Sequence, residues 1–410
     1  MTDSPHAPPE PGTAQPLPPH RHFLEVLLIF TRLGLTSFGG PVAHLGYFRE
    51  EFVHRRRWLD EHNYADLVAL CQFLPGPASS QVGMALGISR AGLWGALAAW
   101  LGFTLPSALV LVLFALGVTA VGDLGNAGWL QGLKIVAVAV VAQAVLGMAK
   151  NLTPDRARAA LALGAAITVL LLPTTFIQVL VILAAGLIGW RFLPSAGPVA
   201  GAELPLTLSR RLGVAFLGLF GLLLVGLPLL RETVGGPFLS VFDSFYRAGS
   251  LVFGGGHVVL PLLEAEVVPP GWVTRDAFLA GYGATQAVPG PLFAFSAYLG
   301  AVSQVGLNRL VAAAVALGAI FLPSFLLVAG ALPFWNALRA RPAVQSALRG
   351  VNAGVVGILL AALYTPVFTV AVATPLDFAL VLGAFALLEY AKLAPWLVVA
   401  LSALVGGLLL

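Results

Sequence analysis

The stretch Leu93–Thr119, LWGALAAWLGFTLPSALVLVLFALGVT, contains no charged residue and is long enough to cross a lipid bilayer as a helix. A second such stretch, Leu310–Leu332, lies in the other half of the chain. Of the 410 residues, 59% are hydrophobic and 10% are charged, against about 25% charged in an average soluble domain. A soluble fold could not bury so much apolar surface, and the alternation expected of a β-barrel is missing. The sequence therefore predicts an all-α polytopic membrane protein.

Charge and cysteine content exclude several other classes of protein. The net charge of +4 does not indicate nucleic-acid binding, because the basic residues lie in short loops, where they set membrane topology. The single cysteine, Cys71, excludes an internal disulfide and a paired-cysteine redox motif. The sequence has no pair of histidines at metal-ligand spacing and no phosphate-loop motif. We therefore expect no cofactor, no nucleic-acid partner and no enzymatic activity.

Two groups of motifs recur in the same order along the chain. The motif Arg32-x-Gly34-x-x-x-Phe38-Gly39-Gly40 returns in the second half as Arg247-x-Gly249-x-x-x-Phe253-Gly254-Gly255. The motif Gln72-x-x-Pro75-Gly76-Pro77 returns at almost the same separation as Gln286-x-x-Pro289-Gly290-Pro291. Further matching pairs are Trp58 with Trp272, Ser107 with Ser324, and Lys134 with Asn352. The common order and nearly constant separation indicate an internal repeat.

The charges of matching loops reverse between the two halves. Basic loops of the first half match acidic loops of the second, namely Arg49, Arg55, Arg56 and Arg57 with Glu264, Glu266 and Asp276, and Lys150, Arg156 and Arg158 with Asp377. The loop Gly122–Gly128 has no base, whereas its match carries Arg339 and Arg341. Since Lys and Arg in short loops favour the cytoplasm, the second half is predicted to be inverted in the membrane.

These patterns predict two inverted-topology repeats of six hydrophobic segments each. The unmatched helix Gly213–Leu230 adds one crossing to an even number and so turns the second half over. We expect a disordered tail (residues 1–22), a first membrane repeat (23–191), a linker with one transmembrane helix (192–238) and an inverted second repeat (239–410).

Glycine and proline interrupt the hydrophobic segments at matching positions. His22–Tyr47 is broken at Phe38–Pro41, and Tyr64–Ile88 at Pro75–Pro77, so these segments form either re-entrant hairpins or kinked spanning helices. Non-helical backbone at membrane depth is tolerated where it is buried in protein or faces water, so the breaks mark a candidate site. Half-helices that begin after Gly40, Pro77, Gly255 and Pro291 direct N–H groups at that site, which suits an anion. Inverted repeats with interrupted helices are typical of secondary transporters.

The predicted substrate-binding residues lie at or near these breaks. They are Arg32, Gly39, Gly40, Gln72, Gly76, Ser79, Ser80, Lys134, Arg247, Gly254, Gly255, Gln286, Gly290 and Asn352. Each also has a structural interpretation. The arginines either hold the anion's oxygens or pair with Glu25 and Asp243, and Lys134 either binds the anion or reaches water. The glutamines either donate to the anion or cap broken backbone, and the serines occupy helix-capping positions. His44 and His257 are expected to be hydrogen-bonded interior histidines rather than proton carriers.

At these motifs the sequence resembles the long, two-domain members of the chromate ion transporter family. The resemblance rests on Phe38–Pro41, Phe73–Pro77, Phe253–His257, Val288–Pro291 and Gly350–Ala353, and it covers Phe23–Leu410. It implies an inner-membrane carrier that exports chromate from the cytoplasm, with sulfate as a related dianion. The expected partners are chromate or sulfate, the lipid bilayer and, as one alternative, a second copy in a homodimer. A passive oxyanion channel, an oxyanion uptake carrier and a membrane-bound oxyanion reductase are the other functions that fit the sequence.

Overall fold

The computed structural model describes residues 19–38, 40–120, 128–172, 175–194, 208–253, 256–335 and 341–410. Within these ranges all regular elements are helical and no strand occurs, which confirms the predicted all-α class. Five of the described helical stretches are long and apolar enough to cross a membrane, namely Ala78–Thr119, Gly128–Leu152, Arg210–Val234, Arg309–Phe334 and Pro342–Ala371. Predictions about the N-terminal tail up to residue 18, the loop 121–127, Arg339, Gly39, Gly254 and Gly255 lie outside the described residues.

The two halves contain corresponding elements on either side of one linking helix. The first half comprises α1 (Pro19–Thr36), α2 (Gly40–Arg49), the π-helical turn η1 (Glu50–Arg55), α3 (Glu61–Phe73), α4 (Ala78–Ala120), α5 (Gly128–Leu152), α6 (Arg156–Leu171) and α7 (Thr175–Phe192). Helix α8 (Arg210–Val234) links the halves. The second half comprises α9 (Pro237–Ser250), η2 (Gly256–Val258), α10 (Val259–Val267), α11 (Arg275–Thr285), η3 (Leu292–Ala294), α12 (Phe295–Val302), α13 (Arg309–Ala331), η4 (Leu332–Phe334), α15 (Pro342–Ala362), η5 (Leu363–Phe368), α16 (Thr369–Ala371), α17 (Pro375–Glu389) and α18 (Pro395–Leu409).

The segments broken at Pro-Gly-Pro fold as hairpins rather than as kinked spanning helices. In the second half, the Gln304 amide donates to the Trp272 carbonyl at 2.9 Å, so the chain returns to its starting level after α12. In the first half, the Arg90 guanidinium lies over the Trp58 ring, 5.3 Å from its centroid. Helix α3 has 13 residues and is therefore about 20 Å long, which is too short to cross a hydrocarbon core of about 30 Å.

The segments broken at Gly-Gly also turn back on themselves. In the first half, the rings of Phe30 and Phe52 stack with centroids 5.2 Å apart, and Arg32 pairs with Glu51. In the second half, Arg247 Nη2 lies 2.8 Å from Glu266 Oε2. The two glutamates are as far apart along the sequence as the two arginines, so they are repeat partners as well. Equivalent Arg–Glu ion pairs thus join the two limbs of each Gly-Gly hairpin.

Local sequence starts and stops the hairpin limbs at matching positions. The Asp60 side chain accepts from the Asn63 amide at the start of α3, and the Thr274 hydroxyl accepts from the Ala277 amide at the start of α11. These N-caps occupy equivalent positions of the repeat and satisfy backbone donors that the first helical turn leaves free. Helix α4 bends at Gly92, where φ is +60°, so that its first part completes a hairpin and its second part forms a long span.

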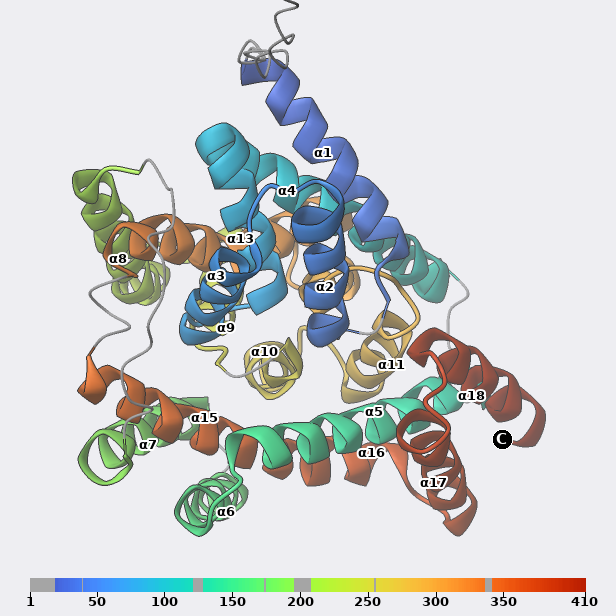
Figure 1. Cartoon of the computed structure of the whole chain (residues 1–410). Helices are drawn as coiled ribbons and strands as arrows, with labels where there is room; N and C mark the ends of the chain where they lie inside the picture. The colour runs from blue at the N-terminus through green and yellow to red at the C-terminus, as the bar shows by residue number, and fades with distance from the viewer. Residues whose placement is uncertain are drawn as a thin grey trace, which may run out of the picture.

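The halves exchange contacts reciprocally. The Gly76 amide donates to the Val252 carbonyl at 2.7 Å, and the Gly290 amide donates to the Ser37 carbonyl at 2.9 Å. Helix α5 packs against α17 and α18 of the second half, while α15 packs against α6 and α7 of the first. Figure 1 shows α5 and α15 running across the lower part of the molecule, with α6 and α7 at one end and α17 and α18 at the other. Such reciprocity is expected for two copies of one fold around an approximate two-fold axis.

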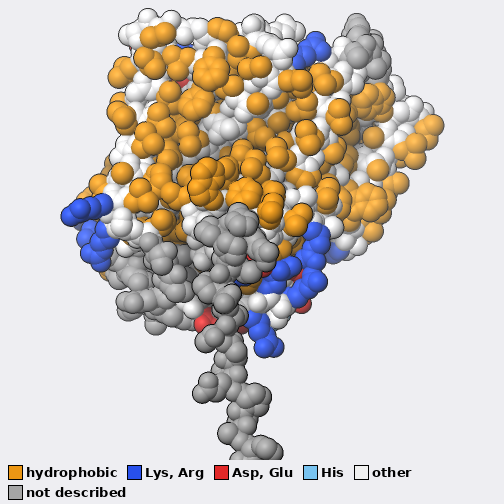
Figure 2. All heavy atoms as spheres, turned by 90° about the horizontal axis from the view of Figure 1, so that it is seen from above, with side chains coloured by type: hydrophobic (Ala, Val, Ile, Leu, Met, Phe, Trp, Pro, Cys, Tyr) orange, Lys and Arg blue, Asp and Glu red, His pale blue; other side chains and the backbone are white. Residues whose placement is uncertain are grey.

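The exposed surface is suited to a membrane. Figure 2 shows hydrophobic side chains over the middle of the face, with Lys and Arg gathered mainly along its lower border. Helix α8 has few buried residues, and Leu222, Val225 and Leu229 on it are more than half exposed. Hydrophobic side chains that would be unfavourable in water are favourable against lipid tails, which agrees with a multi-pass membrane protein.

Candidate substrate-binding site

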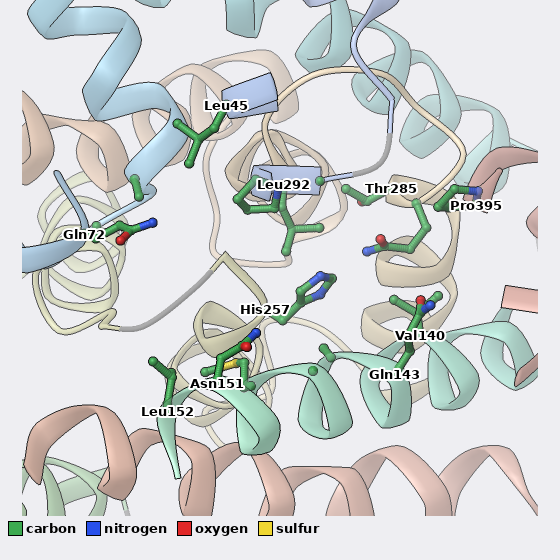
Figure 3. A pocket seen from close by; sticks show the side chains of 18 of the residues that line it. Leu45, Gln72, Val140, Gln143, Asn151, Leu152, His257, Thr285, Leu292 and Pro395 are labelled. Carbon is green, nitrogen blue, oxygen red and sulfur yellow. The ribbon is translucent and has the colours of Figure 1, made fainter. Parts of the chain in front are cut away.

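A cavity of about 630 Å³ lies where the four hairpin turns meet. Gly40 and Gly76 line it from the first half, and His257 and Gly290 line it from the second. One face of α5, from Val140 to Leu152, forms the opposite wall. Figure 3 shows the His257 ring between the hairpin turns and this face of α5, with Gln143 and Asn151 on the helix.

Four helical segments begin at the cavity. α2 starts at Gly40, α4 at Ala78, η2 at Gly256 and η3 at Leu292. Except for Gly256, these starting residues line the cavity themselves, and His257 lines it beside Gly256. The free N–H groups of a first helical turn carry partial positive charge, so this arrangement favours a negatively charged ligand.

Several carbonyl groups at the ends of the preceding limbs already have donors. The Ser37 and Val252 carbonyls accept from the amides of Gly290 and Gly76, respectively. The Pro75 carbonyl accepts from Gln81 Nε2 at 2.7 Å. These bonds reduce the negative potential that unpaired carbonyls would place near the cavity. The free N–H groups of the first helical turns are therefore the main backbone groups that face a ligand.

The cavity is polar without being ionic. Among the described residues that line it, none is Lys, Arg, Asp or Glu. Its hydrogen-bonding side chains are Gln72, Gln143, Asn151, His257, Thr285, Gln286 and Asn352. Within the described part of the chain, the buried Gln286 Nε2 has no hydrogen-bond partner, so it is available to a ligand. Neutral amide donors and helix beginnings can hold an oxyanion without adding a fixed full charge to the membrane interior.

His257 has a fixed orientation in this site. Its Nδ1 lies 2.6 Å from the Tyr282 hydroxyl, and Tyr282 is completely buried. When the hydroxyl donates to Nδ1, the ring proton resides on Nε2, which then becomes a donor for a bound anion. The histidine is therefore hydrogen-bonded, as predicted, and it also lines the cavity.

The cavity lies along the Leu152 end of α5. At the other end α5 packs against α11, where a side chain at Gly283 would meet the Leu133 carbonyl and Lys134 Nζ lies 2.8 Å from Asp276 Oδ1. The helices related to this pair by the repeat are α15 and α3. No comparable packing joins these two in the described residues, and the cavity lies between Gln72 on α3 and Asn352 on α15.

The second pair of helices shows the same asymmetry. α10 packs against α15, whereas its counterpart α2 is separated from α5 by the cavity, with Leu45 on one side and Met148 on the other. Two helix–helix contacts are thus closed, and the two contacts related to them by the repeat are open. The cavity ends near Leu152, beside Lys150.

The family model for the chromate transporter matches the chain twice, over residues 24–190 and 239–407. The chain belongs to the chromate transporter family. Each match covers one of the halves described above, so both halves contain the family's characteristic sequence.

Transporters from other organisms resemble the chain over most of its length. The chromate transport protein of Pseudomonas aeruginosa is 29% identical over 368 residues, which cover 85% of this chain and 82% of that protein. The chromate transport protein of Cupriavidus metallidurans is 28% identical, covering 93% and 92%. An uncharacterized transporter of Methanocaldococcus jannaschii is 26% identical, covering 94% of both chains. No solved structure gives a significant match.

The structure brings six of the predicted substrate-binding residues to the cavity of this chromate transporter family member. They are Gly40, Gln72, Gly76, Gln286, Gly290 and Asn352. All but Asn352 belong to the breaks, so they were predictable from the repeated motifs. Ser79 and Ser80 are buried in the first turn of α4 but do not line the cavity, and Ser79 Oγ lies 3.3 Å from His44 Nδ1.

The predicted basic residues lie in ion pairs away from the cavity. Arg32 pairs with Glu51 rather than with Glu25, Arg247 pairs with both Asp243 and Glu266, and Lys134 pairs with Asp276. The prediction from sequence considered Asp243 as a partner but overlooked Glu51 and Glu266. Their separation along the chain equals that of the two arginines, and this match is the signal that could have identified them.

Sequence reasoning missed three polar residues of the cavity. Thr285 immediately precedes the predicted Gln286, and Gln143 and Asn151 project from the apolar helix α5. Gln143, Gly147 and Asn151 recur at every fourth position and therefore share one helix face. That spacing, in a helix with so few other polar residues, is the signal that could have identified the two on α5.

Proposed function

We propose that this protein is a secondary carrier that exports chromate from the cytoplasm and also accepts sulfate. The observation that carries the proposal is the convergence of four helix beginnings and several neutral hydrogen-bond donors on one cavity. Membership of the chromate transporter family and the relatives named chromate transport protein support the substrate class.

The cavity's chemistry suits a tetrahedral dianion. Chromate and sulfate offer four acceptor oxygens and no donor, so amide and imidazole N–H groups can surround them. We propose Gln72, Gln286 and Asn352 as side-chain ligands, together with His257 and backbone N–H groups after Gly40, Gly76 and Gly290. Because the binding groups are neutral, the site would hold the anion without a full positive charge among the described lining residues.

We propose that Arg32, Arg247 and Lys134 contribute indirectly. Their ion pairs hold hairpin limbs or close one end of the molecule, and their guanidinium or ammonium groups add long-range positive potential. This role differs from direct oxygen binding and predicts different effects of substitution.

The direction of transport follows from the proposed orientation. Lys150, Arg156 and Arg158 lie at or just beyond the Leu152 end of α5, which is the end that lines the cavity, and basic loops favour the cytoplasm. The cavity would then face inward and take up a cytoplasmic anion. A membrane potential that is negative inside favours exit of a dianion by about 4.6 kcal/mol per 100 mV, so export needs no ATP.

The contact asymmetry between the halves supports alternating access. The closed contacts are α5 with α11 and α15 with α10, and the open ones are α15 with α3 and α5 with α2. If the halves exchanged these arrangements, the cavity would close toward the cytoplasm and open outward. We propose this exchange as the transport step, in which each half takes the conformation of the other.

The decisive experiment is flux in proteoliposomes with clamped pH and voltage, using labelled chromate and sulfate. We expect saturable efflux, acceleration of labelled efflux by unlabelled substrate on the opposite side, and a rate that increases with a potential negative inside. Non-saturating flux without this exchange would indicate a channel. Flux directed inward at the same potential and coupled to a cation gradient would indicate an uptake carrier.

The same assay tests the site. Gln286→Ala removes an amide whose Nε2 has no partner among the described residues, so the fold should tolerate the change. Loss of a hydrogen bond to a charged ligand costs about 1.5–3 kcal/mol, so we expect at least tenfold weaker chromate binding. Gln304→Ala, which changes an exposed glutamine outside the cavity, is the matched control and should leave chromate binding unchanged. Equal chromate affinity in both variants would exclude Gln286 from the site.

A further inference from the structure

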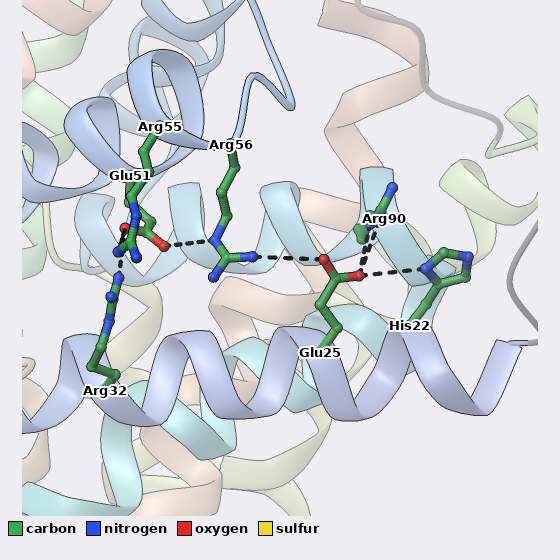
Figure 4. Close-up of polar contacts among 7 residues, drawn as sticks. All are labelled: His22, Glu25, Arg32, Glu51, Arg55, Arg56 and Arg90. Atoms are coloured by element: carbon green, nitrogen blue, oxygen red, sulfur yellow. Dashed lines mark hydrogen bonds and ion pairs between the residues drawn. The ribbon is translucent and has the colours of Figure 1, made fainter. Parts of the chain in front are cut away.

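A second hollow, of about 530 Å³, lies at the end of the first Gly-Gly hairpin. It is lined by Glu25, Arg56, Arg57, Trp58, Leu59, Ser89 and Arg90, which come from α1, the segment after η1 and the first part of α4. None of these residues lines the transport cavity. Figure 4 shows the ion pairs around the hollow, which form a continuous chain from Arg32 to His22 along α1.

The hollow has more positive than negative charge. Glu25 Oε2 lies 3.0 Å from Arg90 Nη2, and Glu25 Oε1 lies 3.7 Å from Arg56 Nη1. The neighbouring Glu51 already binds Arg32, Arg55 and Arg56. Two carboxylates therefore serve four arginines, and Arg57 adds a fifth guanidinium that makes no ion pair with another described residue. This excess favours binding of an anion.

Arg57 occupies a backbone conformation that favours glycine. Its φ is +54°, and the matching residue in the second half is Gly271, with φ +76°. Each directly precedes a matching tryptophan, Trp58 or Trp272. A left-handed conformation costs a residue with a side chain roughly 1–2 kcal/mol, whereas glycine adopts it freely. The first half therefore carries an arginine at an energetic cost that the second half avoids.

Exposed apolar side chains lie close in sequence to residues that line the hollow. Leu24 and Leu28 flank Glu25 on α1, and Trp94 follows Arg90 on α4; they are 53%, 69% and 70% exposed, respectively. Trp58 and Trp94 are tryptophans of the kind that concentrate at membrane interfaces. A ligand with an anionic head and apolar chains would match both the charge of the hollow and the surface beside it.

We propose that this hollow binds the phosphate of an anionic phospholipid, with Arg57, Arg90 and Arg56 around the headgroup. Arginine binds phosphate oxygens through paired N–H groups, and basic pockets between helices on the cytoplasmic side take up anionic headgroups. The second half has no equivalent pocket chemistry, because Gly271 and Gln304 stand where the first half has Arg57 and Arg90. The site is distinct from the proposed anion-transport cavity and does not depend on the transported substrate.

The variant Arg57→Gly tests the proposal without weakening the fold. Glycine relieves the left-handed conformation, so the thermal midpoint should stay the same or rise. Binding of phosphatidylglycerol, measured by native mass spectrometry of delipidated protein, should weaken at least tenfold relative to wild type. Arg57→Lys keeps the charge but loses the planar pair of N–H donors. Its affinity for phosphatidylglycerol should therefore lie between those of wild type and Arg57→Gly. Arg156→Gln, an exposed arginine at the start of α6, is the matched control and should bind phosphatidylglycerol like wild type.

The probes separate a lipid from a free anion. We expect phosphatidylglycerol to bind at least tenfold more tightly than phosphatidylcholine, and inorganic phosphate at millimolar concentration not to displace it. Equal retention of the two lipids, or unchanged phosphatidylglycerol binding in Arg57→Gly, would overturn the proposal. Displacement by inorganic phosphate, together with equal affinity for phosphate and lipid, would show that the hollow is a site for a free oxyanion and would also overturn it.

Discussion

Gly76 and Gly290 each combine an unusual backbone conformation with a close approach between the halves. Gly76 has φ +128°, and a Cβ atom there would lie 2.5 Å from Ser324 Oγ and from Gln81 Nε2. Gly290 has φ +99°, and its Cβ would lie 2.8 Å from Ser107 Oγ. Ser107 and Ser324 are repeat partners, so the same contact is made twice. These glycines therefore fix how the Pro-Gly-Pro turns of one half rest on the long span of the other.

This arrangement predicts different costs for alanine at two cavity glycines. Gly76→Ala adds both a strained backbone and a steric clash, whereas Gly40→Ala adds strain only, because nothing lies within 4 Å of a Cβ at Gly40. We expect Gly40→Ala to cost about 1–2 kcal/mol and Gly76→Ala to cost clearly more. Thermal unfolding of the purified variants measures this difference. Equal thermal midpoints for Gly40→Ala and Gly76→Ala would mean that the Pro-Gly-Pro turn of the first half does not pack against Ser324.

There is a physical reason why the sequence placed the two glutamines at the cavity correctly but misplaced the two arginines. Gln72 and Gln286 were found from sequence because a break in a helix fixes the place of its neighbours. The arginines could not be placed in the same way, because a long flexible side chain reaches several positions and its partner is decided by the return of the hairpin. The return of each hairpin brings Glu51 beside Arg32 and Glu266 beside Arg247, and the sequence marks these glutamates only as a second pair at the same separation.

At the scale of helices, the ion pair between hairpin limbs substitutes for the packing that a full-length span would provide. The limb α10 has only nine residues, and such a short helix is unstable by itself. The Arg247–Glu266 pair, with Glu266 only 9% exposed, ties this limb to α9. Sequence alone could not choose between hairpin and kink, because Tyr64–Ile88 is long enough to span the membrane in either form.

A double-mutant cycle at Arg247 and Glu266 tests this structural role. Arg247→Gln leaves the largely buried Glu266 without its ion-pair partner and should be destabilised by about 3 kcal/mol, whereas Glu266→Gln should cost less because Arg247 keeps its ion pair with Asp243. The double variant should be less destabilised than the sum of the two single variants. The difference, which is the coupling free energy of the pair, should be about 1 kcal/mol or more. The more exposed pair Arg275–Glu264, 3.7 Å apart, is the control and should show little coupling.

Chromate affinity in the same variants separates a structural role from direct binding. We expect the folded Arg247→Gln protein to bind chromate with an affinity within about threefold of wild type. A tenfold or greater loss of affinity, with unchanged stability, would instead show that the arginine holds the anion's oxygens.

At the scale of the whole molecule, the repeat makes a second conformation predictable from the first. The order of motifs and the reversal of loop charges were sufficient to predict two related halves. The open or closed state of each contact was not predictable, because both states use the same residues and differ by a small rearrangement. Lys134 and Asp276 mark the closed contact of α5 with α11, and the repeat relates them to Asn352 on α15 and His62 on α3.

Cross-linking these two pairs distinguishes the two conformations. In a Cys71→Ala background, Lys134→Cys with Asp276→Cys should react readily with a short bifunctional thiol reagent in protein without substrate, because that contact is closed in the structure described here. His62→Cys with Asn352→Cys should react slowly in the same state, because the cavity keeps α3 and α15 apart. Chromate supplied on both sides of proteoliposomes allows the carrier to cycle, so reaction of the second pair should become faster. Either cross-link should stop flux, whereas Lys134→Cys and Asp276→Cys, which lie outside the cavity, should each retain flux when present alone and treated with the reagent. Rapid reaction of both pairs without substrate, or normal flux through either cross-linked protein, would refute the exchange of conformations between the halves.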